Sequence, residues 1–564
     1  MKNLAVITGF GGINAAGRSA GHHAFRRMVL ESLSPADRER TLTALAALMG
    51  TTDEQAILDG TLVREWDNVD WDAKAVPFHE PFKDADGNQC WRLTHRRLPV
   101  QSAGQMPKGF DPAKLYRSHH HPRGLQMAVF AASDALGSLG VEWETLCQHV
   151  GPDEIAVYAG SSMGQNDGYG NGGMLQSALL GKRTSSKQCA MGMSQMPADF
   201  INAYVLGNVG KTGSITAACA TFLYNLQMAK NDIESGRRRI VIVGNAESPL
   251  VPEIVEGYNA MTALASEANL KKLDGKNAEE AADLRRACRP FGENCGFTIA
   301  ESAQFFILTD DKLALELGLS IHGSIGDVQV NADGYKKSIS NPGVGNYLTM
   351  AKVMASTRRE LGDEALKNSF VHAHGSSTPQ NRVTESHIYE ELARAFGISD
   401  WPITAVKTFV GHSLAAASAD QLMATLGTWA TGLIPGIKTT DKIADDVHQQ
   451  GLEFVLQDKS VDSDKMVVGF VNAKGFGGNN ASAAIISPTK TRELLQARHG
   501  DSALQNWMNN NQAVAAASQA YDDAMLRGEM EPRYRFGENV LEPADLEITD
   551  TEIRIRGWDK PVIL

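Results

Sequence analysis

The stretch SITAACATFLYNLQMAKNDIESGRRRIVIVGNAES, residues 214–248, contains a helical pattern followed directly by a strand pattern. After Cys219, apolar residues recur at helical spacing at Phe222, Leu223 and Leu226, until Gly236 ends the pattern. The β-branched run at 239–243 that follows is typical of a buried strand. A helix that leads into a buried strand is the repeating unit of α/β folds, so this stretch predicts that class.

The same alternation extends over most of the chain. Helix-length segments such as 221–234, 383–396 and 414–431 separate short β-branched runs at 4–8, 155–158, 239–243, 304–308, 369–372, 403–406 and 466–471. We therefore expect an α/β fold with mostly parallel sheets.

Two segments interrupt the alternation of helices and strands. The first is an insertion at about 18–152, which is helical at 20–48 and rich in Trp, Pro, Asp and Gly at 67–94. The second is a tail after Pro488, with a polar helix at 489–527 and a strand at 552–556, and we expect it to be a peripheral addition.

The composition excludes several function classes. The chain has 564 residues, of which 43% are hydrophobic and 21% charged, a balance typical of globular proteins. Lys and Arg number 54 against 66 Asp and Glu, which gives a net charge of −12. Such an acidic chain is not expected to bind nucleic acid or an anionic membrane surface.

The cysteines and the apolar runs indicate a cytoplasmic protein. Six cysteines are scattered without any C-x-x-C pair, which fits a reducing compartment and argues against a disulfide scaffold or thiolate zinc site. Glycines interrupt the first apolar run, so it predicts a strand and turn and no signal peptide. The apolar stretch 414–437 contains Asp420, Gln421 and Pro435, so we expect no transmembrane span.

Cys219 is the first candidate for chemistry. It lies at the first turn of a predicted buried helix, where the helix dipole and unpaired N–H groups favour a thiolate. A free cysteine is more often an inert core residue. The small neighbours Ala217, Ala218 and Ala220 favour the functional reading, because a nucleophile at a cavity floor needs room for its acyl adduct.

Three further stretches place polar groups or glycines at strand ends. SFVHAHGSSTPQNRVTE contains His372 and His374, which alternation places on the same side of a strand, so the pattern alone does not choose between them. ITAVKTFVGHSLAAASADQL places His412 at a helix start, and GFVNAKGFGGNNASAAII has a glycine-rich turn between two strands. One cysteine with two distant histidines suits acyl transfer through a thioester.

Together the four stretches resemble the β-ketoacyl-acyl-carrier-protein synthases of the thiolase-like superfamily. Residues 217–221 are similar to the family's TACAT motif, and 374–379 with Asn381 and Glu385 are similar to HGTSTP…N…E. Lys407, Gly411 and His412 match K-x-x-x-GH, and residues 475–480 match the GFGGTN turn. The resemblance spans about 1–18 and 152–488, in the family's order.

The resemblance implies the fold and the division of the chain. It implies two pseudo-duplicated βαβαβαββ halves that form a five-layered αβαβα core. The nucleophile would lie in an N-terminal half at 1–314 and both histidines in a C-terminal half at 315–488, followed by an extension at 489–564.

The resemblance also implies a role for each motif residue. Cys219 would carry the acyl group, and His374, not His372, would act with His412 on the malonyl thioester carbonyl as CO₂ leaves. The N–H groups of Cys219 and Phe476 would form the oxyanion hole, and the Phe476 side chain would be the gate of the acyl pocket. Gly477 would belong to the residues that bind the substrate or support the site. Further implied residues are Ser376 and Thr378 on phosphopantetheine, and Lys407 with Glu385 as a charge pair that orients the histidines.

Departures from the usual motifs point to one branch of the family. Ser376 replaces Thr, Arg382 replaces Asp, and residues 415–418 and 300–302 differ from the elongating enzymes. GFGGINAAGRSA, HPRGLQM, RPFGENCGFT and HAHGSSTP resemble the atypical Cys-His-His synthases that start fatty-acid chains from acetyl-CoA and malonyl-carrier protein. The alternatives are an elongating synthase that uses acyl-carrier primers, or a non-catalytic ketosynthase-like partner subunit, although such a subunit would lack Cys219.

Other functions fit the sequence less well. Asn14 stands where a dinucleotide-binding loop needs its third glycine. A degradative thiolase would need a C-x-G motif after 466, where the chain has no cysteine. The run His119-His120-His121 predicts a polar loop, because three consecutive residues do not converge on one zinc ion. We expect no metal and no cofactor beyond the phosphopantetheine or CoA of the substrates.

The expected partners follow from the resemblance. They are acyl carrier protein, acetyl-CoA and malonyl-carrier protein as substrates, and a second copy of the chain in a homodimer. Because carrier protein is acidic, an enzyme with a charge of −12 needs a local basic patch. Arg289 is the candidate by motif position, and Arg237, Arg238 and Arg239 are candidates by clustering, although such a cluster is equally typical of a solvated helix end.

Overall fold

The computed structural model describes residues 2–59, 64–65, 78–94 and 97–564, and its largest sheet contains two sets of strands. The strands of the first half are β1 (Ala5–Asn14), β7 (Ile155–Gly160), β8 (Lys211–Gly213), β9 (Ile240–Glu247) and β10 (Ser302–Asp310). Those of the second half are β11 (Gly323–Ala332), β12 (Ser369–His372), β13 (Trp401–Thr404), β15 (Leu452–Phe454), β17 (Val468–Gly475) and β18 (Asn479–Ile486).

The two halves repeat one arrangement of strands. In the first half β10 runs antiparallel to β1 and β9, and β9, β7 and β8 are parallel. In the second half β18 runs antiparallel to β11 and β17, and β17, β12, β13 and β15 are parallel. β1 pairs with β11 and joins the halves. The duplicated α/β fold is confirmed. The sheet is mixed and not mostly parallel, because β10 and β18 each run antiparallel to both of their neighbours.

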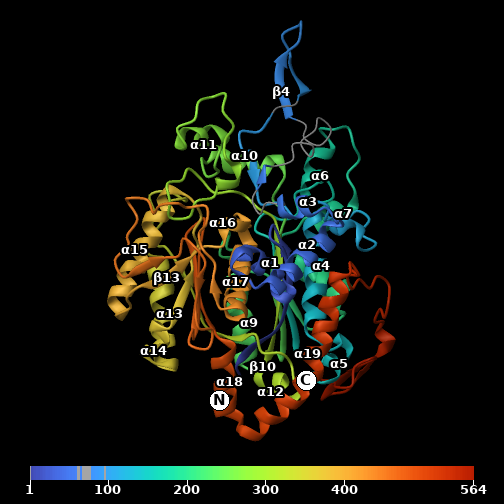
Figure 1. Ribbon diagram of the computed structural model, residues 1–564. Coiled ribbons are helices and arrows are strands. Elements are labelled where there is room, and N and C mark those ends of the chain that lie inside the picture. Colours follow the sequence, from blue (N-terminus) through green and yellow to red (C-terminus); the bar gives the residue numbers. More distant parts are fainter. Residues whose placement is uncertain (1, 60–63, 66–77, 95–96) are drawn as a thin grey trace.

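Helices cover this sheet in layers (Figure 1). α9 (Thr221–Glu234) and α17 (Ala417–Thr431) pack against each other between the halves, through a cluster that includes Phe222, Leu226 and Leu422. α4 (Arg123–Ser138) and α8 (Met196–Ile201) cover the outer face of the first half, and α13 (Gly345–Leu361) and α15 (Pro379–Phe396) cover that of the second. The order αβαβα results, and α4 belongs to this core although it lies within the expected insertion.

Shorter elements connect these layers. The helices are α5 (Trp143–Gln148), α6 (Asn171–Ser177), α7 (Ser186–Met191), α10 (Pro252–Ala260), α11 (Glu267–Leu273), α12 (Asp311–Glu316), α14 (Asp363–Lys367) and α16 (Lys407–Val410). The minor strands are β2 (Gly17–Arg18), β3 (Arg64–Glu65), β6 (Ser102–Ala103), β14 (Leu433–Ile434) and β16 (Lys459–Ser460).

The insertion begins with helices α1 (His23–Met28), α2 (Pro35–Met49) and α3 (Glu54–Asp59). β4 (Phe78–Lys83) and β5 (Gln89–Thr94) form an antiparallel hairpin that stands out from the body at the top of Figure 1. Residues 67–77 of the Trp- and Pro-rich stretch lie outside the described residues.

The C-terminal extension is more than the peripheral addition that we expected. It consists of α18 (Pro488–His499), α19 (Asp501–Leu526) and a small sheet of β19 (Leu546–Ile548), β20 (Glu552–Ile555) and β21 (Val562–Ile563). Gly500, with φ of 83°, divides the single helix expected at 489–527 into α18 and α19.

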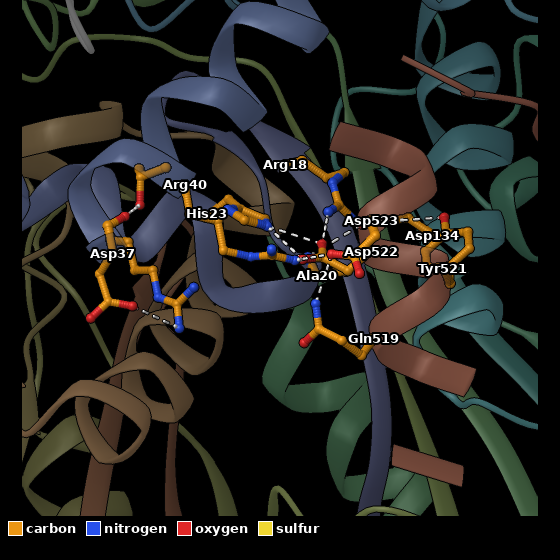
Figure 2. A network of polar contacts seen from close by, with 12 residues as sticks. Arg18, Ala20, His23, Asp37, Arg40, Asp134, Gln519, Tyr521, Asp522 and Asp523 are labelled. Atoms are coloured by element: carbon orange, nitrogen blue, oxygen red, sulfur yellow. Dashed lines mark hydrogen bonds and ion pairs between the residues drawn. The ribbon is translucent and has the colours of Figure 1, made fainter. Parts of the chain in front are cut away.

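A buried polar cluster explains how the extension is held (Figure 2). Asp522 of α19 accepts hydrogen bonds from Arg18, from His23 Nε2 at 2.9 Å and from Arg40 at 2.6 Å. Asp134 of α4 accepts from Arg18 at 2.9 Å and from the Tyr521 hydroxyl at 3.1 Å. We call these residues the extension network: Arg18, His23, Arg40, Asp134, Tyr521 and Asp522. It ties α19 to the insertion and to the core helix α4.

Candidate active site

One cavity of about 550 Å³ brings together side chains from four separate parts of the sequence. Cys219 lies two residues before α9, His374 follows β12, and His412 lies between α16 and α17. All three line the cavity, as do Ser376, Thr378 and Phe476.

The backbone around Cys219 turns sharply to present the thiol. Ala218 has φ of 49°, a left-handed conformation that is unfavourable for a residue with a Cβ and is common at functional turns. Gly475 at the end of β17 allows the glycine-rich turn to approach, because a Cβ there would lie 2.5 Å from the carbonyl oxygen of Ala217. The N–H groups of Cys219 and Phe476 both donate hydrogen bonds to the Cys219 thiol. Two backbone donors therefore converge at one sulfur.

The expectation of a thiolate at Cys219 is not met. Burial raises the pKa of the thiol to about 11, although the Lys407 charge and the two N–H donors act in the opposite direction. Because Cys219 is only 6% exposed, the cost of desolvating a thiolate outweighs the stabilisation that the start of a helix gives to a negative charge. The resting group is a neutral thiol.

The two histidines form a pair of neutral hydrogen-bond donors. Their ring centroids lie 5.3 Å apart with the planes at 84°. The Leu414 N–H donates to His412 Nδ1 at 3.2 Å, which assigns the His412 proton to Nε2. Burial lowers the pKa of both rings, and the nearby Lys407 charge lowers it further. Each imidazole is therefore uncharged near neutral pH.

Glu385 and Lys407 act on the backbone of His374 and not on either ring. Glu385 accepts from the N–H groups of His374 at 2.7 Å and Gly375 at 2.8 Å. The ammonium of Lys407 donates to the carbonyl oxygen of His374. Both peptide groups beside His374 are thus fixed by charged side chains, which places its imidazole in the cavity.

The structure separates the two histidines that alternation left equivalent. His374 lines the cavity. His372 is fully buried against Phe370, with ring centroids 5.6 Å apart, and neither of its ring nitrogens has a partner among the described residues. The difference arises because the strand ends at His372 and the loop that follows redirects His374.

Three further residues of the predicted site are Ser376, Thr378 and Gly477. The hydroxyls of Ser376 and Thr378 lie 3.1 Å apart at the cavity wall, and Gly477 continues the turn after Phe476 with φ of 86°.

Three of the basic candidates, Arg237, Arg239 and Arg289, are held in ion pairs with acidic side chains. Arg289 is only 7% exposed and is paired with Asp274 at 2.8 Å, so its guanidinium is not free for an acidic partner. Residues 237–239 lie at the opposite end of α9 from Cys219, where Arg237 pairs with Asp232 and Arg239 with Asp310.

The sequence did not identify two residues of the site, the buried Asp420 and Lys474, which lines the cavity. Asp420 accepts hydrogen bonds from Ser413, which follows His412, at 2.6 Å and from Asn14 at 2.9 Å, as well as from Ser302 and Gln304. Lys474 lines the cavity itself. The signal for Lys474 was present, because a charged residue directly precedes the glycine-rich turn in GFVNAKGFGG.

The described residues offer no cluster of three or more His, Cys, Asp or Glu side chains arranged to hold a metal ion. In the run 119–121, His121 is buried with its Nδ1 at 3.1 Å from the Tyr116 hydroxyl, whereas His119 and His120 are exposed. None of the described helices is both long and apolar enough to cross a membrane.

Comparison with known proteins identifies relatives along the whole chain. Residues 88–314 match the family model of the β-ketoacyl synthase N-terminal domain, and residues 322–440 match that of the C-terminal domain. The β-ketoacyl-[acyl-carrier-protein] synthase FabY of Pseudomonas aeruginosa is 47% identical over 100% of this chain and 98% of its own length. The crystal structure of the ketosynthase FabY from P. aeruginosa matches with a TM-score of 0.96 over 100% of this chain and 98% of that one.

A more distant structure shares the fold. A β-ketoacyl synthase from Burkholderia phymatum matches with a TM-score of 0.61 at 22% identity, over 86% of this chain and 100% of its own.

Proposed function

The chain belongs to the β-ketoacyl synthase family, and from this premise we propose that it joins acetyl-CoA to malonyl-acyl-carrier protein to give acetoacetyl-acyl-carrier protein. As a 3-oxoacyl-acyl-carrier-protein synthase it is an acyltransferase of fatty-acid synthesis. The observation that carries the proposal is the single cavity that Cys219, His374 and His412 share.

In the first step Cys219 takes up the acetyl group. Its sulfur attacks the carbonyl carbon of acetyl-CoA, the bond from that carbon to the CoA sulfur breaks, and CoA leaves as a thiol with the proton that Cys219 loses. The N–H groups of Cys219 and Phe476, which both point at the sulfur, stabilise the oxyanion. Each such donor contributes about 3 kcal/mol to the stabilisation of a transition state.

In the second step the malonyl thioester loses CO₂. The bond between its methylene carbon and its carboxylate breaks, and the electron pair becomes an enolate on the thioester. His374 and His412 donate hydrogen bonds to the enolate oxygen, a task for which neutral imidazoles with one N–H each are suited.

In the third step the enolate carbon attacks the acetyl carbonyl carbon on Cys219. The Cys219 sulfur leaves as a thiolate and takes up a proton from water, and the β-ketoacyl product remains on the carrier. Ser376 and Thr378, on the cavity wall, are placed to contact the phosphopantetheine arm.

A short starter is supported by the packing around Cys219. Tyr258, Phe297 and Leu414 belong to the same apolar cluster as Cys219, and the Tyr258 ring stacks on Phe476 with centroids 6.0 Å apart. We infer that this apolar packing around Cys219 favours the two-carbon acetyl group over a long acyl chain.

We also propose a homodimer and a cytoplasmic location, without a bound cofactor. β8 lies at the end of the sheet order, and the apolar side chains of Val209 and Ile215 beside it are exposed. A second copy that pairs with this edge would cover them. The six cysteines are all free thiols, which fits a reducing compartment.

The proposed domain division follows the duplication of the sheet. β10 ends at Asp310 and β11 begins at Gly323, which supports a boundary near 314 between the halves. β18 ends at Ile486, which supports the start of the extension near 489.

We propose that the carrier protein approaches the mouth near α11. Asn269 of α11 lines the cavity, and the exposed Lys272 follows it on the same helix. This surface is closer to the mouth than the 237–239 cluster, and it can attract an acidic partner.

The starter assignment is tested with purified enzyme and malonyl-carrier protein, offered either acetyl-CoA or a medium-chain acyl-carrier protein. We expect acetoacetyl-carrier protein with acetyl-CoA. Product only with the medium-chain primer would overturn the initiating assignment in favour of an elongating synthase. Absence of product with both primers would favour the non-catalytic subunit.

A further inference from the structure

Lys474 is a cation in the catalytic cavity without a carboxylate partner. It lies near the end of β17, is partly buried, and lines the same cavity as Cys219, His374 and His412. Its ammonium donates to the Thr384 hydroxyl at 2.8 Å. Within the described part of the chain it forms no ion pair.

The two carboxylates whose charges act on Lys474 have other partners. Glu385 already accepts five hydrogen bonds, from the N–H groups of His374 and Gly375 and from the side chains of Asn381, Tyr389 and Asn472. Asp333 accepts from Lys336 at 3.1 Å, Asn480 at 2.7 Å and the Gly345 N–H at 3.0 Å. Neither carboxylate is therefore directed at the Lys474 ammonium.

A cation in such a place is expected to meet an anion when the cavity is filled. Removing a charged group from water is unfavourable unless an opposite charge accompanies it. Burial lowers the pKa of Lys474, and the charges of Glu385 and Asp333 offset this only in part. The ammonium has three donors, of which the Thr384 hydroxyl uses one.

The position of Lys474 indicates which anion it meets. The next residue, Gly475, packs directly on the carbonyl of Ala217 beside Cys219, and Phe476 follows with its N–H on the thiol. Lys474 is thus at the thioester end of the cavity, whereas the phosphate of CoA or of the carrier is separated from the thioester by the whole pantetheine arm. The malonyl group carries a free carboxylate near its thioester, and the acetyl group carries none.

We propose that the Lys474 ammonium binds the free carboxylate of the malonyl thioester and so selects it over neutral acyl thioesters for the second half-reaction. This inference rests on the proposed function. Lys474 keeps its proton throughout: the carboxylate leaves as CO₂, and its negative charge passes to the thioester oxygen at His374 and His412. Because the contact exists before the carbon–carbon bond breaks, it contributes to malonyl affinity rather than to the rate of bond breaking.

The test uses the full chain with Lys474→Met, which keeps the length of the side chain without its charge. A charge-assisted contact corresponds to a change in affinity of roughly tenfold to a hundredfold. We expect the KM for malonyl-carrier protein to rise by that factor, while acetyl transfer from acetyl-CoA to Cys219 stays within about twofold. The unchanged acetyl transfer also shows that the variant is folded.

Two further variants sharpen the result. Lys474→Arg keeps the charge and should restore most of the malonyl affinity. Lys336→Met removes a second cavity lysine, one already paired with Asp333, and should affect the malonyl KM less than Lys474→Met.

Three outcomes would overturn the inference. An equal loss of acetyl transfer and malonyl affinity would indicate a phosphate contact, since both substrates carry that group. An unchanged malonyl KM would mean that Lys474 binds no substrate carboxylate, and a Lys474→Arg variant as weak as Lys474→Met would exclude a charge contact. Failure of the wild type to use acetyl-CoA would instead contradict the proposed starter, and the malonyl comparison would then be made with the primer that the enzyme accepts.

Discussion

The extension network and the catalytic cavity are both buried and polar, but they treat their polar atoms differently. In the extension network the carboxylates of Asp522 and Asp134 each accept from several donors, as Figure 2 shows. In the cavity, the Lys474 ammonium has only the Thr384 hydroxyl as a hydrogen-bond partner among the described residues.

We infer from this difference that the extension network stabilises the fold and that the cavity groups act in the reaction. Buried polar groups are normally satisfied, because an unpaired group loses its hydration without replacement. The satisfied carboxylates hold α19 against the insertion and α4. The Lys474 ammonium in the cavity, by contrast, keeps donors that a bound substrate could use under the proposed function. Substitutions in the two regions should therefore affect different quantities, stability in one and individual reaction steps in the other.

The largest effect is expected from Cys219→Ser in the cavity. A hydroxyl is a poorer nucleophile and leaving group than a thiol, so condensation should fall by roughly three orders of magnitude or more. The rate of acetoacetyl-carrier formation measures this loss. The urea midpoint should stay near that of the wild type, and a large drop in it would mean that Cys219 serves the framework instead.

In the extension network, Asp522→Asn should lower the free energy of unfolding by about 3 kcal/mol or more, because it removes the charge that the buried Arg18 shares with Arg40 and leaves Asp134 as the remaining carboxylate on Arg18. Urea unfolding measures the change. The neighbouring Asp523→Asn is the matched control, since Asp523 is 45% exposed and its contacts with Arg40 and Gln519 lie at the surface, and it should change stability by less than about 1 kcal/mol. Equal losses of stability in the two variants would contradict the claim that the buried ion pairs of Asp522 contribute more than the exposed contacts of Asp523.

The contribution of Asp522 should depend on pH in a defined direction. Its neighbours hold the pKa of Asp522 below the usual carboxyl range, so the folded state binds this proton less readily than the unfolded state. The stabilisation is therefore present above the ordinary Asp pKa of about 4 and is lost as the pH falls through the lowered pKa. The stability difference between wild type and Asp522→Asn should shrink in acid. A difference that grows in acid would contradict the assigned ion pairs.

Within the cavity, His412→Ala should separate the reaction steps. Loss of one donor to the enolate should reduce decarboxylation by roughly a hundredfold to a thousandfold, while acetyl transfer to Cys219 changes little. Release of CO₂ from malonyl-carrier protein measures the first step, and covalent acetylation measures the second. An equal loss in both would mean that His412 serves the nucleophile and not the malonyl group.

The smallest expected effect is the pH dependence of alkylation at Cys219. Because burial raises the pKa of the thiol to about 11, the thiolate fraction should increase about tenfold per pH unit between pH 7 and 9. The rate of iodoacetamide reaction at Cys219, followed by peptide mass mapping, measures this slope. An alkylation rate that levels off by about pH 8 would instead indicate a lowered thiol pKa and the thiolate that the sequence predicts.

The parts that the sequence predicted are those that depend on local pattern. The runs at 155–158 and 369–372 are strands because β-branched and apolar residues there suit buried pairing, and Cys219 precedes a helix as its spacing indicates. The choice of His374 over His372 required the family resemblance, since both lie on one side of a strand pattern. The strand β11 was not expected, because its sequence GSIGDVQVNA mixes glycine and polar residues.

The parts that were not predicted depend on neighbours that are distant in the sequence. The thiol pKa of Cys219 is set by burial that only the packed halves create. The docking role predicted for Arg289 stays a prediction, and its ion pair with Asp274 depends on a contact that the sequence pattern does not show. The pairing of Arg18 with Asp522 joins residues at opposite ends of the chain, so a tail that is polar and rich in Ala and Asn gave no sign of its anchor.

The measurement that most directly tests the account is the site of acetylation after the wild-type enzyme is mixed with acetyl-CoA alone. Proteolysis and mass mapping should locate a single acetyl thioester on Cys219, and addition of malonyl-carrier protein should remove it as acetoacetyl-carrier protein forms. Acetyl groups on another cysteine, such as Cys295 in the same cavity, or an acetyl group on Cys219 that malonyl-carrier protein does not remove, would contradict it.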